Sequence, residues 1–365
     1  MSATVQAQYA TQTLDGRDNL VEVERLTKHF AVKQGVFAAG KGIVHAVEDV
    51  TLTVRKGETL GIVGESGCGK STTARLIVRL LEPTAGAVRF EGRDITHAPQ
   101  RQLRPLRRQM QMIFQDPYSS LNPRKSVGQI IGEPFSIHRT EKDVKRRVQE
   151  LLARVGLSPE HYNRYPHEFS GGQRQRIGVA RAIALQPRLI VCDEPVSALY
   201  VSVQAQILNL LKDLQKDFDL TYVFISHDLS VIRQVSDRIA VMYLGRVVEL
   251  SESEALYEHP RHPYTAALLS AVPRHSPTTG TAQRKRIVLG GDVPSPVNPP
   301  EACVFHPRCP RFQRGHCDVE TPILRSFEPG HEAACHYPVE RWPMTEEELR
   351  RPLGATAGDS NETNG

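Results

Sequence analysis

Long hydrophobic runs are missing from this chain of 365 residues. The longest apolar runs, such as residues 189–192, are far shorter than the roughly 20 residues that a transmembrane helix needs. The first residues also lack a basic segment followed by an apolar stretch, which a secretory signal requires. We therefore expect a cytosolic chain that does not itself span a membrane, with its cysteines reduced unless they hold a metal.

The chain also has little excess charge, because 46 Lys and Arg residues face 41 Asp and Glu residues, a net charge of +5. So small an excess is weak support for a nucleic-acid partner. Hydrophobic residues make up 39% of the chain, which excludes disorder throughout and suffices for one large or two modest globular domains. Cysteines are few and uneven: two stand alone, at 68 and 192, and four lie close together, at 303, 309, 317 and 335.

Short β-type runs alternate with helical stretches between residues 21 and 250. We expect strands over residues 21–26, 59–63, 189–192, 222–225 and 239–243. We expect helices over residues 70–81, 201–214 and 229–235. This alternation predicts an α/β domain over 21–250, with a largely parallel sheet covered on both faces.

Strand signals disappear between residues 115 and 185, where 142–155 and 173–184 have a helical pattern. We therefore expect a helical subdomain over about 116–186. After residue 252, Pro and His become frequent and break regular elements, so we place a boundary near 251 and a small extension over 251–340. The ends, 1–20 and 341–365, are predicted to be disordered tails.

A phosphate-binding loop follows the strand predicted over 59–63 and begins a helix, which is the context that the pattern G-x-x-x-x-G-K-[ST] requires. Its residues are Gly64, Glu65, Ser66, Gly67, Cys68, Gly69, Lys70, Ser71 and Thr72. Glycines let backbone N–H groups face phosphate oxygens, and the N-terminus of the helix adds its positive dipole end. Lys70 would reach the β- and γ-phosphates, and the Ser71 hydroxyl would ligate Mg²⁺. The loop predicts a site for a nucleoside triphosphate.

Two acids end the apolar strand at 189–192. Asp193 is placed to hold Mg²⁺, directly or through water, and Glu194 to polarise a water for attack on the γ-phosphate. His227 follows the strand at 222–225 and is a candidate for orienting that water or the transferred group.

A second anion-binding nest precedes an Arg-rich helix and consists of Ser170, Gly171, Gly172 and Gln173, after Phe169. One site has a single γ-phosphate, so a second nest in the same chain indicates that it serves the nucleotide of another subunit.

Together, these segments resemble the ATP-binding-cassette (ABC) ATPases. Residues 64–72 are similar to Walker A, 189–194 to Walker B with its general base, and 169–173 to the LSGGQ signature with Phe in place of Leu. The resemblance implies that two subunits form a head-to-tail sandwich, in which the Ser170 segment of one subunit closes over ATP on the other.

Three single residues complete the resemblance. Gln115 is similar to the Q-loop glutamine, for which the resemblance implies a role in catalysis and at Mg²⁺. His227 is similar to the switch histidine. Phe30 falls where the family places an aromatic ring that stacks on adenine, although a bare Phe would otherwise be a core residue.

The segments 118–124, 261–265 and 294–296 resemble the dipeptide/oligopeptide importer branch, and most closely its second type of ATP-binding subunit. The resemblance implies two transmembrane permease subunits, a second and different ATPase subunit, and an extracytoplasmic substrate-binding protein. The chain would then lie at the cytoplasmic face of the inner membrane. Nickel or glutathione is the alternative cargo within this branch.

One departure from the family pattern lies at Tyr200, because the D-loop normally reads Ser-Ala-Leu-Asp and here ends in Tyr. We expect weakened communication between the two ATP sites, with a tolerated variant as the alternative.

The four clustered cysteines point to a metal, because disulfides are disfavoured in the cytosol. Their spacing does not match C-x₂-C zinc modules, but a mixed Cys/His zinc site would draw on the histidines at 306, 316, 331 and 336. Four thiolates also suit a [4Fe–4S] cluster. The importer branch carries such a cluster in this extension, so the resemblance favours iron–sulfur over zinc, with Cys303, Cys309, Cys317 and Cys335 as ligands.

Two rival functions fit less well. A soluble cassette ATPase acting on nucleic acid or ribosomes would need a long coiled-coil insertion or two cassettes, and this chain has neither sustained heptads nor a second phosphate loop. An exporter cassette is commonly fused to membrane helices. We therefore expect an ATP-hydrolysing importer subunit with no nucleic-acid partner.

Overall fold

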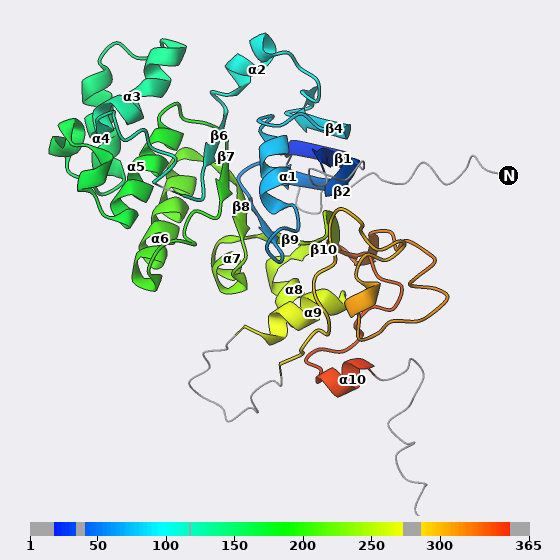
Figure 1. Cartoon of the computed structure of the whole chain (residues 1–365). Coiled ribbons are helices and arrows are strands. Elements are labelled where there is room, and N and C mark those ends of the chain that lie inside the picture. Colours follow the sequence, from blue (N-terminus) through cyan, green and yellow to red (C-terminus); the bar gives the residue numbers. More distant parts are fainter. Residues whose placement is uncertain (1–17, 34–40, 117, 273–285, 351–365) are drawn as a thin grey trace, which may run out of the picture.

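Five parallel strands form the centre of the structure, a computed structural model that describes residues 18–33, 41–116, 118–272 and 286–350 (Figure 1). They are, in spatial order, β6 (Met110–Ile113), β7 (Leu189–Asp193), β8 (Thr221–Ser226), β3 (Thr59–Val63) and β9 (Arg238–Tyr243). Every residue of β3, β7, β8 and β9 is buried, which explains their nearly continuous apolar sequences. The predicted parallel sheet is confirmed.

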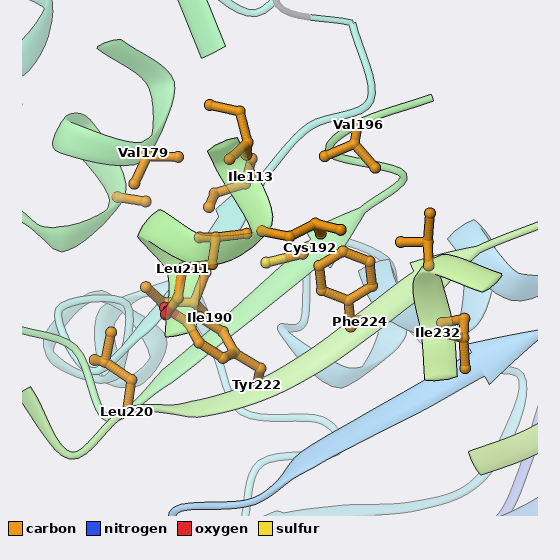
Figure 2. Packing of buried hydrophobic residues seen from close by; sticks show 14 of the residues in the cluster. Ile113, Val179, Ile190, Cys192, Val196, Leu211, Leu220, Tyr222, Phe224 and Ile232 are labelled. Atoms are coloured by element: carbon orange, nitrogen blue, oxygen red, sulfur yellow. The ribbon is translucent and has the colours of Figure 1, made fainter. Parts of the chain in front are cut away.

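Two hydrophobic cores cover the two faces of this sheet, because side chains along a strand alternate between faces. On one face, Ile190, Cys192 and Phe224 pack beneath α5 (Gly171–Ile183) and α6 (Val201–Phe218) (Figure 2). On the other face, the alternate residues of the same strands pack against α1 (Lys70–Ile77) and a second sheet.

That second sheet is antiparallel and was largely missed by the sequence analysis, which predicted only residues 21–26 of it. Its strands are, in spatial order, β2 (Lys41–Arg55), β1 (Asn19–Lys33), β4 (Ala85–Phe90) and β5 (Arg93–Asp94). Only one face of it contributes to the core, so its apolar residues alternate with polar ones and give no continuous run. The domain therefore combines a parallel and an antiparallel sheet.

The segment predicted as a helical subdomain contains helices, and between residues 115 and 185 the described residues contain no strand. Its elements are α3 (Val127–His138), α4 (Val144–Arg154), η1 (Pro159–Asn163), η2 (Pro166–Glu168) and α5. It lies beyond β6 and β7, away from β1 and β2 (Figure 1).

Helix ends differ from the predicted ones where the backbone turns left-handed. The helix predicted over 70–81 ends at Ile77, and Arg79 has a φ of 54°. The helix predicted over 201–214 continues to Phe218, before Asp219 at φ 50°. The helix at 229–235 is α7 (Leu229–Val235), as predicted. The short α2 (Gln100–Leu106) was not predicted.

The extension continues the main sheet rather than forming a separate layer. Beside β9 follow the antiparallel strands β10 (Arg246–Glu252), β12 (His331–Ala333) and β11 (Arg325–Glu328). The boundary predicted near 251 thus falls within β10. The extension also contains α8 (Ser253–Glu258), α9 (Pro263–Ser270) and η3 (His306–Arg308).

The predicted tails differ from the structure at their inner ends. Residues 1–17 and 351–365 lie outside the described residues, but β1 already begins at Asn19. The stretch 341–350 contains α10 (Glu346–Arg350), because Leu349 is fully buried against Ile287 and Val339. In the part of the chain that is described, no helix has both the length and the apolar character needed to cross a bilayer.

Candidate functional site

The phosphate-binding loop joins β3 to α1, as predicted. Gly69 caps α1 in a left-handed conformation, with a φ of 101°, and a Cβ there would overlap the backbone carbonyl of Ala46. Gly64 is similarly confined, because its Cβ would overlap the carbonyl oxygen of Met242. Glycine at these two positions lets the loop lie directly against β2 and β9.

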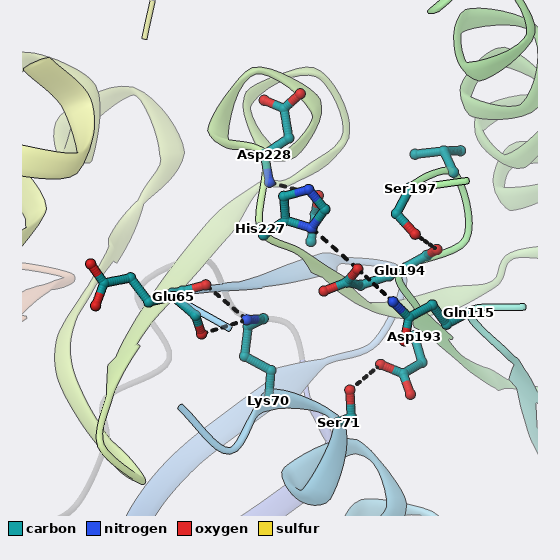
Figure 3. Close-up of polar contacts among 12 residues, drawn as sticks. Glu65, Lys70, Ser71, Gln115, Asp193, Glu194, Ser197, His227 and Asp228 are labelled. Atoms are coloured by element: carbon teal, nitrogen blue, oxygen red, sulfur yellow. Dashed lines mark hydrogen bonds and ion pairs between the residues drawn. The ribbon is translucent and has the colours of Figure 1, made fainter. Parts of the chain in front are cut away.

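Lys70 and Ser71 lie where the loop becomes helix, facing the ends of the strands (Figure 3). The buried Lys70 side chain donates to the carbonyl oxygens of Gly64, at 2.7 Å, and Glu65, at 3.0 Å. The Ser71 hydroxyl donates to Asp193 Oδ1 at 2.6 Å. The structure therefore brings together the phosphate loop and the acid at the end of β7, which are 122 residues apart.

Asp193 is almost completely buried, and this burial raises the pKa of its carboxyl group. The hydrogen bond from Ser71 and the nearby guanidinium of Arg75, at 3.9 Å, act in the opposite direction. Hydroxyl and carboxylate oxygens are the hard ligands that Mg²⁺ prefers. Ser71 and Asp193 thus fit the predicted Mg²⁺ site.

Glu194 is the point on which the predicted catalytic residues converge (Figure 3). Its Oε2 accepts a hydrogen bond from Gln115 Nε2 at 3.0 Å and lies 3.2 Å from His227 Nδ1. These residues follow β6, β7 and β8, whose carboxyl ends meet at one edge of the sheet. The carboxylate is in hydrogen-bond reach of groups that can orient it and a water molecule.

The backbone of Glu194 is left-handed, with a φ of 47°, which is uncommon for a residue with a side chain. Its N–H donates to the carbonyl oxygen of Ile225 at 3.1 Å, and its carbonyl accepts from the Ser197 hydroxyl at 3.1 Å. These bonds hold a backbone conformation that costs on the order of 1–3 kcal/mol.

The segment Ser170–Gln173 caps the N-terminus of α5 and is not part of the phosphate-binding loop. The Ser170 hydroxyl accepts from the Gln173 N–H, and the Gln173 side chain accepts from the Ser170 N–H at 3.0 Å, a capping box. Gly171 and Gly172 face Leu199 and Val203, near the start of α6. Among the described residues, no hydrogen bond joins Ser170–Gln173 to residues 64–72, so the structure leaves the second nest outside the phosphate loop of its own chain.

Phe30 lies on β1 opposite Val44 and is half-buried. The ammonium of Lys28 lies 5.1 Å from the centre of its ring. The adenine-stacking role of Phe30 stays a prediction.

Two contacts that hold the loop were missed by the sequence analysis. The Glu65 N–H donates to the Tyr264 hydroxyl at 2.9 Å, and the Gly245 N–H donates to the Cys68 carbonyl at 2.9 Å. No short sequence motif predicts these two hydrogen bonds, because the partners are more than 170 residues apart. Cys68 itself is buried, and this burial raises the pKa of its thiol.

The four clustered cysteines are free thiols that gather in the loops of the extension. The N–H of Cys303 donates to the carbonyl of Cys317 at 3.2 Å. Burial raises the pKa of the thiols of Cys303 and Cys309, and that of Cys335 to about 12. In the described part of the chain, no three of the four sulfurs lie within 4.8 Å of one another.

Of the histidines named for a mixed zinc site, His306 lies beside Cys303, with Nδ1 2.9 Å from the Cys303 carbonyl oxygen, and the other three have different partners. His331 is buried against Glu249, with Nε2 2.7 Å from Oε1. His316 and His336 gather with Glu320 in a separate, partly exposed group. Zinc–sulfur bonds of about 2.3 Å would place tetrahedral sulfurs only about 3.8 Å apart. The arrangement therefore does not support the zinc alternative.

Comparisons with known proteins agree with this geometry. Residues 47–197 match the family described as ABC transporter, and residues 248–317 match the oligopeptide/dipeptide transporter, C-terminal region. The chain is 52% identical to the oligopeptide transport ATP-binding protein AppF of Bacillus subtilis, over 89% of this chain and 99% of that protein. It is 49% identical to the dipeptide transport ATP-binding protein DppF of Escherichia coli, over 89% and 96%.

A solved structure is also similar: the dimeric ATP-binding cassette MJ0796 bound to ADP and Pi. Its TM-score is 0.57, with 29% identity over 64% of this chain and 98% of that one. The fold, the site and these similarities define the class: the chain is an ATPase that belongs to the ABC transporter family, as an ATP-binding subunit. Within that family, it belongs with the dipeptide and oligopeptide transport ATP-binding proteins.

Replacing Glu194 by Gln tests the assignment of the general base. The substitution keeps the hydrogen-bonding shape but removes the proton acceptor, so we expect ATP hydrolysis to fall by about 10²–10⁴-fold while nucleotide binding remains. Phosphate release and equilibrium binding of ATP would be measured on the same preparation. The exposed Glu160→Gln is the matched control, and undiminished hydrolysis by Glu194→Gln would assign the base elsewhere.

Proposed function

We propose that this chain powers the import of di- or oligopeptides through partner membrane subunits by binding and hydrolysing ATP. The observation that carries the proposal is the convergence of Gln115 and His227 on Glu194, beside the paired Ser71 and Asp193. This constellation lies in a chain whose relatives are named as peptide transport ATP-binding proteins.

The chemistry follows from the residues around Glu194. Its carboxylate takes a proton from a water molecule as that water attacks the γ-phosphate, and Gln115 and His227 hold the carboxylate and the water in line. Lys70 balances negative charge on the β- and γ-phosphates. Mg²⁺, when held by Ser71 and Asp193 with Gln115, supplies further charge neutralisation.

Hydrolysis would take place in a head-to-tail pair of ATPase subunits. The capped N-terminus of α5 presents Ser170, Gly171 and Gly172 away from the phosphate loop of their own chain, which suits a nucleotide bound to a partner. The similar MJ0796 cassette is dimeric. We propose that the partner ATPase is a different chain of the same family.

The same proposal includes the other partners of the chain and its location in the cell. Two transmembrane permease subunits would contact the helical subdomain, and an extracytoplasmic binding protein would deliver the peptide to them. The chain would then be peripheral, at the cytoplasmic face of the inner membrane, with no nucleic-acid partner.

Peptide uptake by cells that lack this chain tests the proposal. We expect complementation with the wild-type chain or Glu160→Gln to restore uptake of a labelled dipeptide, and Glu194→Gln to fail, because only hydrolysis resets the pair of subunits. Fractionation of the same cells should place the chain with membranes. Unimpaired uptake in the deleted cells, or association with RNA in place of membranes, would contradict the proposal.

We further propose that communication between the two ATP sites is weakened, because Tyr200 stands where the D-loop normally has an acid. It is the N-cap residue of α6, its side chain makes no capping hydrogen bond, and it is 87% exposed beside the 81% exposed Val201. An acid here would both cap α6 and present a charge where the second subunit docks.

The variants Tyr200→Asp and Tyr200→Asn separate these two effects. Both side chains cap helices, so each should raise the free energy of unfolding by about 1 kcal/mol, measured by denaturant titration. Only the charged Asp should also change the ATPase rate and its coupling to transport in the assembled importer. If Tyr200→Asp left rate and coupling unchanged, the proposal would be wrong.

We also propose a [4Fe–4S] cluster on Cys303, Cys309, Cys317 and Cys335. Among the described residues, no three of the four sulfurs lie within 4.8 Å of one another, which does not fit a single zinc, and four thiolates are the ligand set of a [4Fe–4S] cluster. Arg311 is buried near Cys335, and its Nε has no hydrogen-bond partner in the described part of the chain. Neutral thiols leave that buried cation uncompensated, whereas thiolate-bound iron and sulfide would supply negative charge.

Anaerobic purification with determination of iron, zinc and acid-labile sulfide tests this site. We expect about four iron and four sulfide per chain with visible absorption, because four thiolates hold the cluster. Cys335→Ser should lose most of the iron, and Cys68→Ser, outside the extension, should keep it. Stoichiometric zinc without sulfide would overturn the proposal.

A further inference from the structure

The side chain and the backbone of Glu65 face opposite directions in the phosphate loop (Figure 3). Its carbonyl oxygen accepts from Lys70 Nζ, on the side where phosphates bind. Its carboxylate points away from Lys70, toward the extension. The established ATPase chemistry makes no use of that carboxylate.

Arg308 of η3 meets this carboxylate with both of its terminal nitrogens. Nη1 lies 2.8 Å from Glu65 Oε2, and Nη2 lies 3.3 Å from Oε1. Nη1 also lies 3.4 Å from the Tyr243 hydroxyl. The Arg308 side chain is 9% exposed and that of Glu65 28%, so the pair is largely removed from water. A two-pronged contact of this kind fixes orientation as well as distance.

A buried aromatic group holds Arg308 in place. Phe305, directly before η3, is 1% exposed and packs edge-on against Tyr243, with ring centres 5.2 Å apart. It also lies 5.5 Å from the ring of Tyr264, whose hydroxyl accepts the Glu65 N–H. The extension and the segments that precede it therefore fix both the backbone and the side chain of Glu65 in the phosphate-binding loop.

The charges indicate what this contact does for the nucleotide. ATP brings several negative charges to a loop in which Glu65 carries another. With Arg308 in place, that carboxylate is neutralised and directed outward. Without Arg308, the loop that binds the phosphates would keep an unpaired and half-buried carboxylate, which is costly in itself and adds negative charge that opposes the binding of ATP.

We propose that Arg308 is a positioning residue for ATP: through its contact with Glu65, the extension sets the geometry and the charge of the phosphate loop. Among the described residues, the polar partners of its guanidinium are Glu65 and Tyr243, so Arg308 would act on the nucleotide only through Glu65. The proposal does not depend on which cargo the importer carries or on whether the cysteines hold iron.

Equilibrium binding of the magnesium complex of the non-hydrolysable analogue AMP-PNP to the full-length chain tests this role, with calorimetry as the measurement. We expect Arg308→Met to raise the Kd about tenfold, which corresponds to about 1.4 kcal/mol. Arg314→Met is the matched control, because Arg314 is an exposed arginine of the same extension, and it should bind like the wild type.

The double variant Glu65→Gln with Arg308→Met separates positioning from a general loss of structure. Removing the carboxylate that Arg308 neutralised should return the Kd most of the way to the wild-type value, a coupling that two independent defects would not show. Arg308→Lys keeps the charge without the two-pronged contact, so it should give an intermediate Kd and serves if Arg308→Met does not fold.

Two outcomes would overturn the proposal. One is an unchanged Kd in a folded Arg308→Met. The other is a raised Kd that Glu65→Gln does not restore, because the arginine would then act only through the stability of the extension.

Discussion

The whole site depends on parallel strand pairing. Because β6, β7 and β8 run in one direction beside β3, their carboxyl ends deliver Gln115, Asp193, Glu194 and His227 to one edge of the sheet, next to the loop that follows β3. Ligands in open α/β sheets bind at this edge for the same reason. Close packing on both faces keeps the strand ends in register, so the buried cores determine how precisely the catalytic groups meet.

The parts of the site that could be predicted are those whose signal is contiguous in the sequence. A buried parallel strand has an apolar sequence, and the residues after such strands are expected to share one edge of the sheet. For this reason Ser71 and Asp193 were both predicted at one Mg²⁺ site, and the structure places their side chains 2.6 Å apart. The segment at Ser170 has a local pattern of the same kind, because Ser170 and Gln173 form a capping box within four residues. Such local patterns indicate both where a residue lies in the fold and what chemistry its side chain supports.

The parts that could not be predicted depend on long-range contacts or on backbone conformation. The antiparallel sheet of β1 and β2 alternates polar and apolar residues, so it resembles loop in a scan for apolar runs. The contacts of Glu65 with Tyr264 and Arg308 join residues that are 199 and 243 positions apart and follow no motif. The left-handed backbone of Glu194 is set by its neighbours in space, not by its own side chain.

The pairing of β12 with β10 has a consequence for any shortened form of the chain. Glu249 and Leu250 of β10 use their outer edge to pair with Ala333 and Glu332. A chain ending after β10 would lose that cover and present an unpaired strand edge flanked by apolar side chains, which is a template for pairing with another molecule. The extension thus also covers this strand edge against self-association.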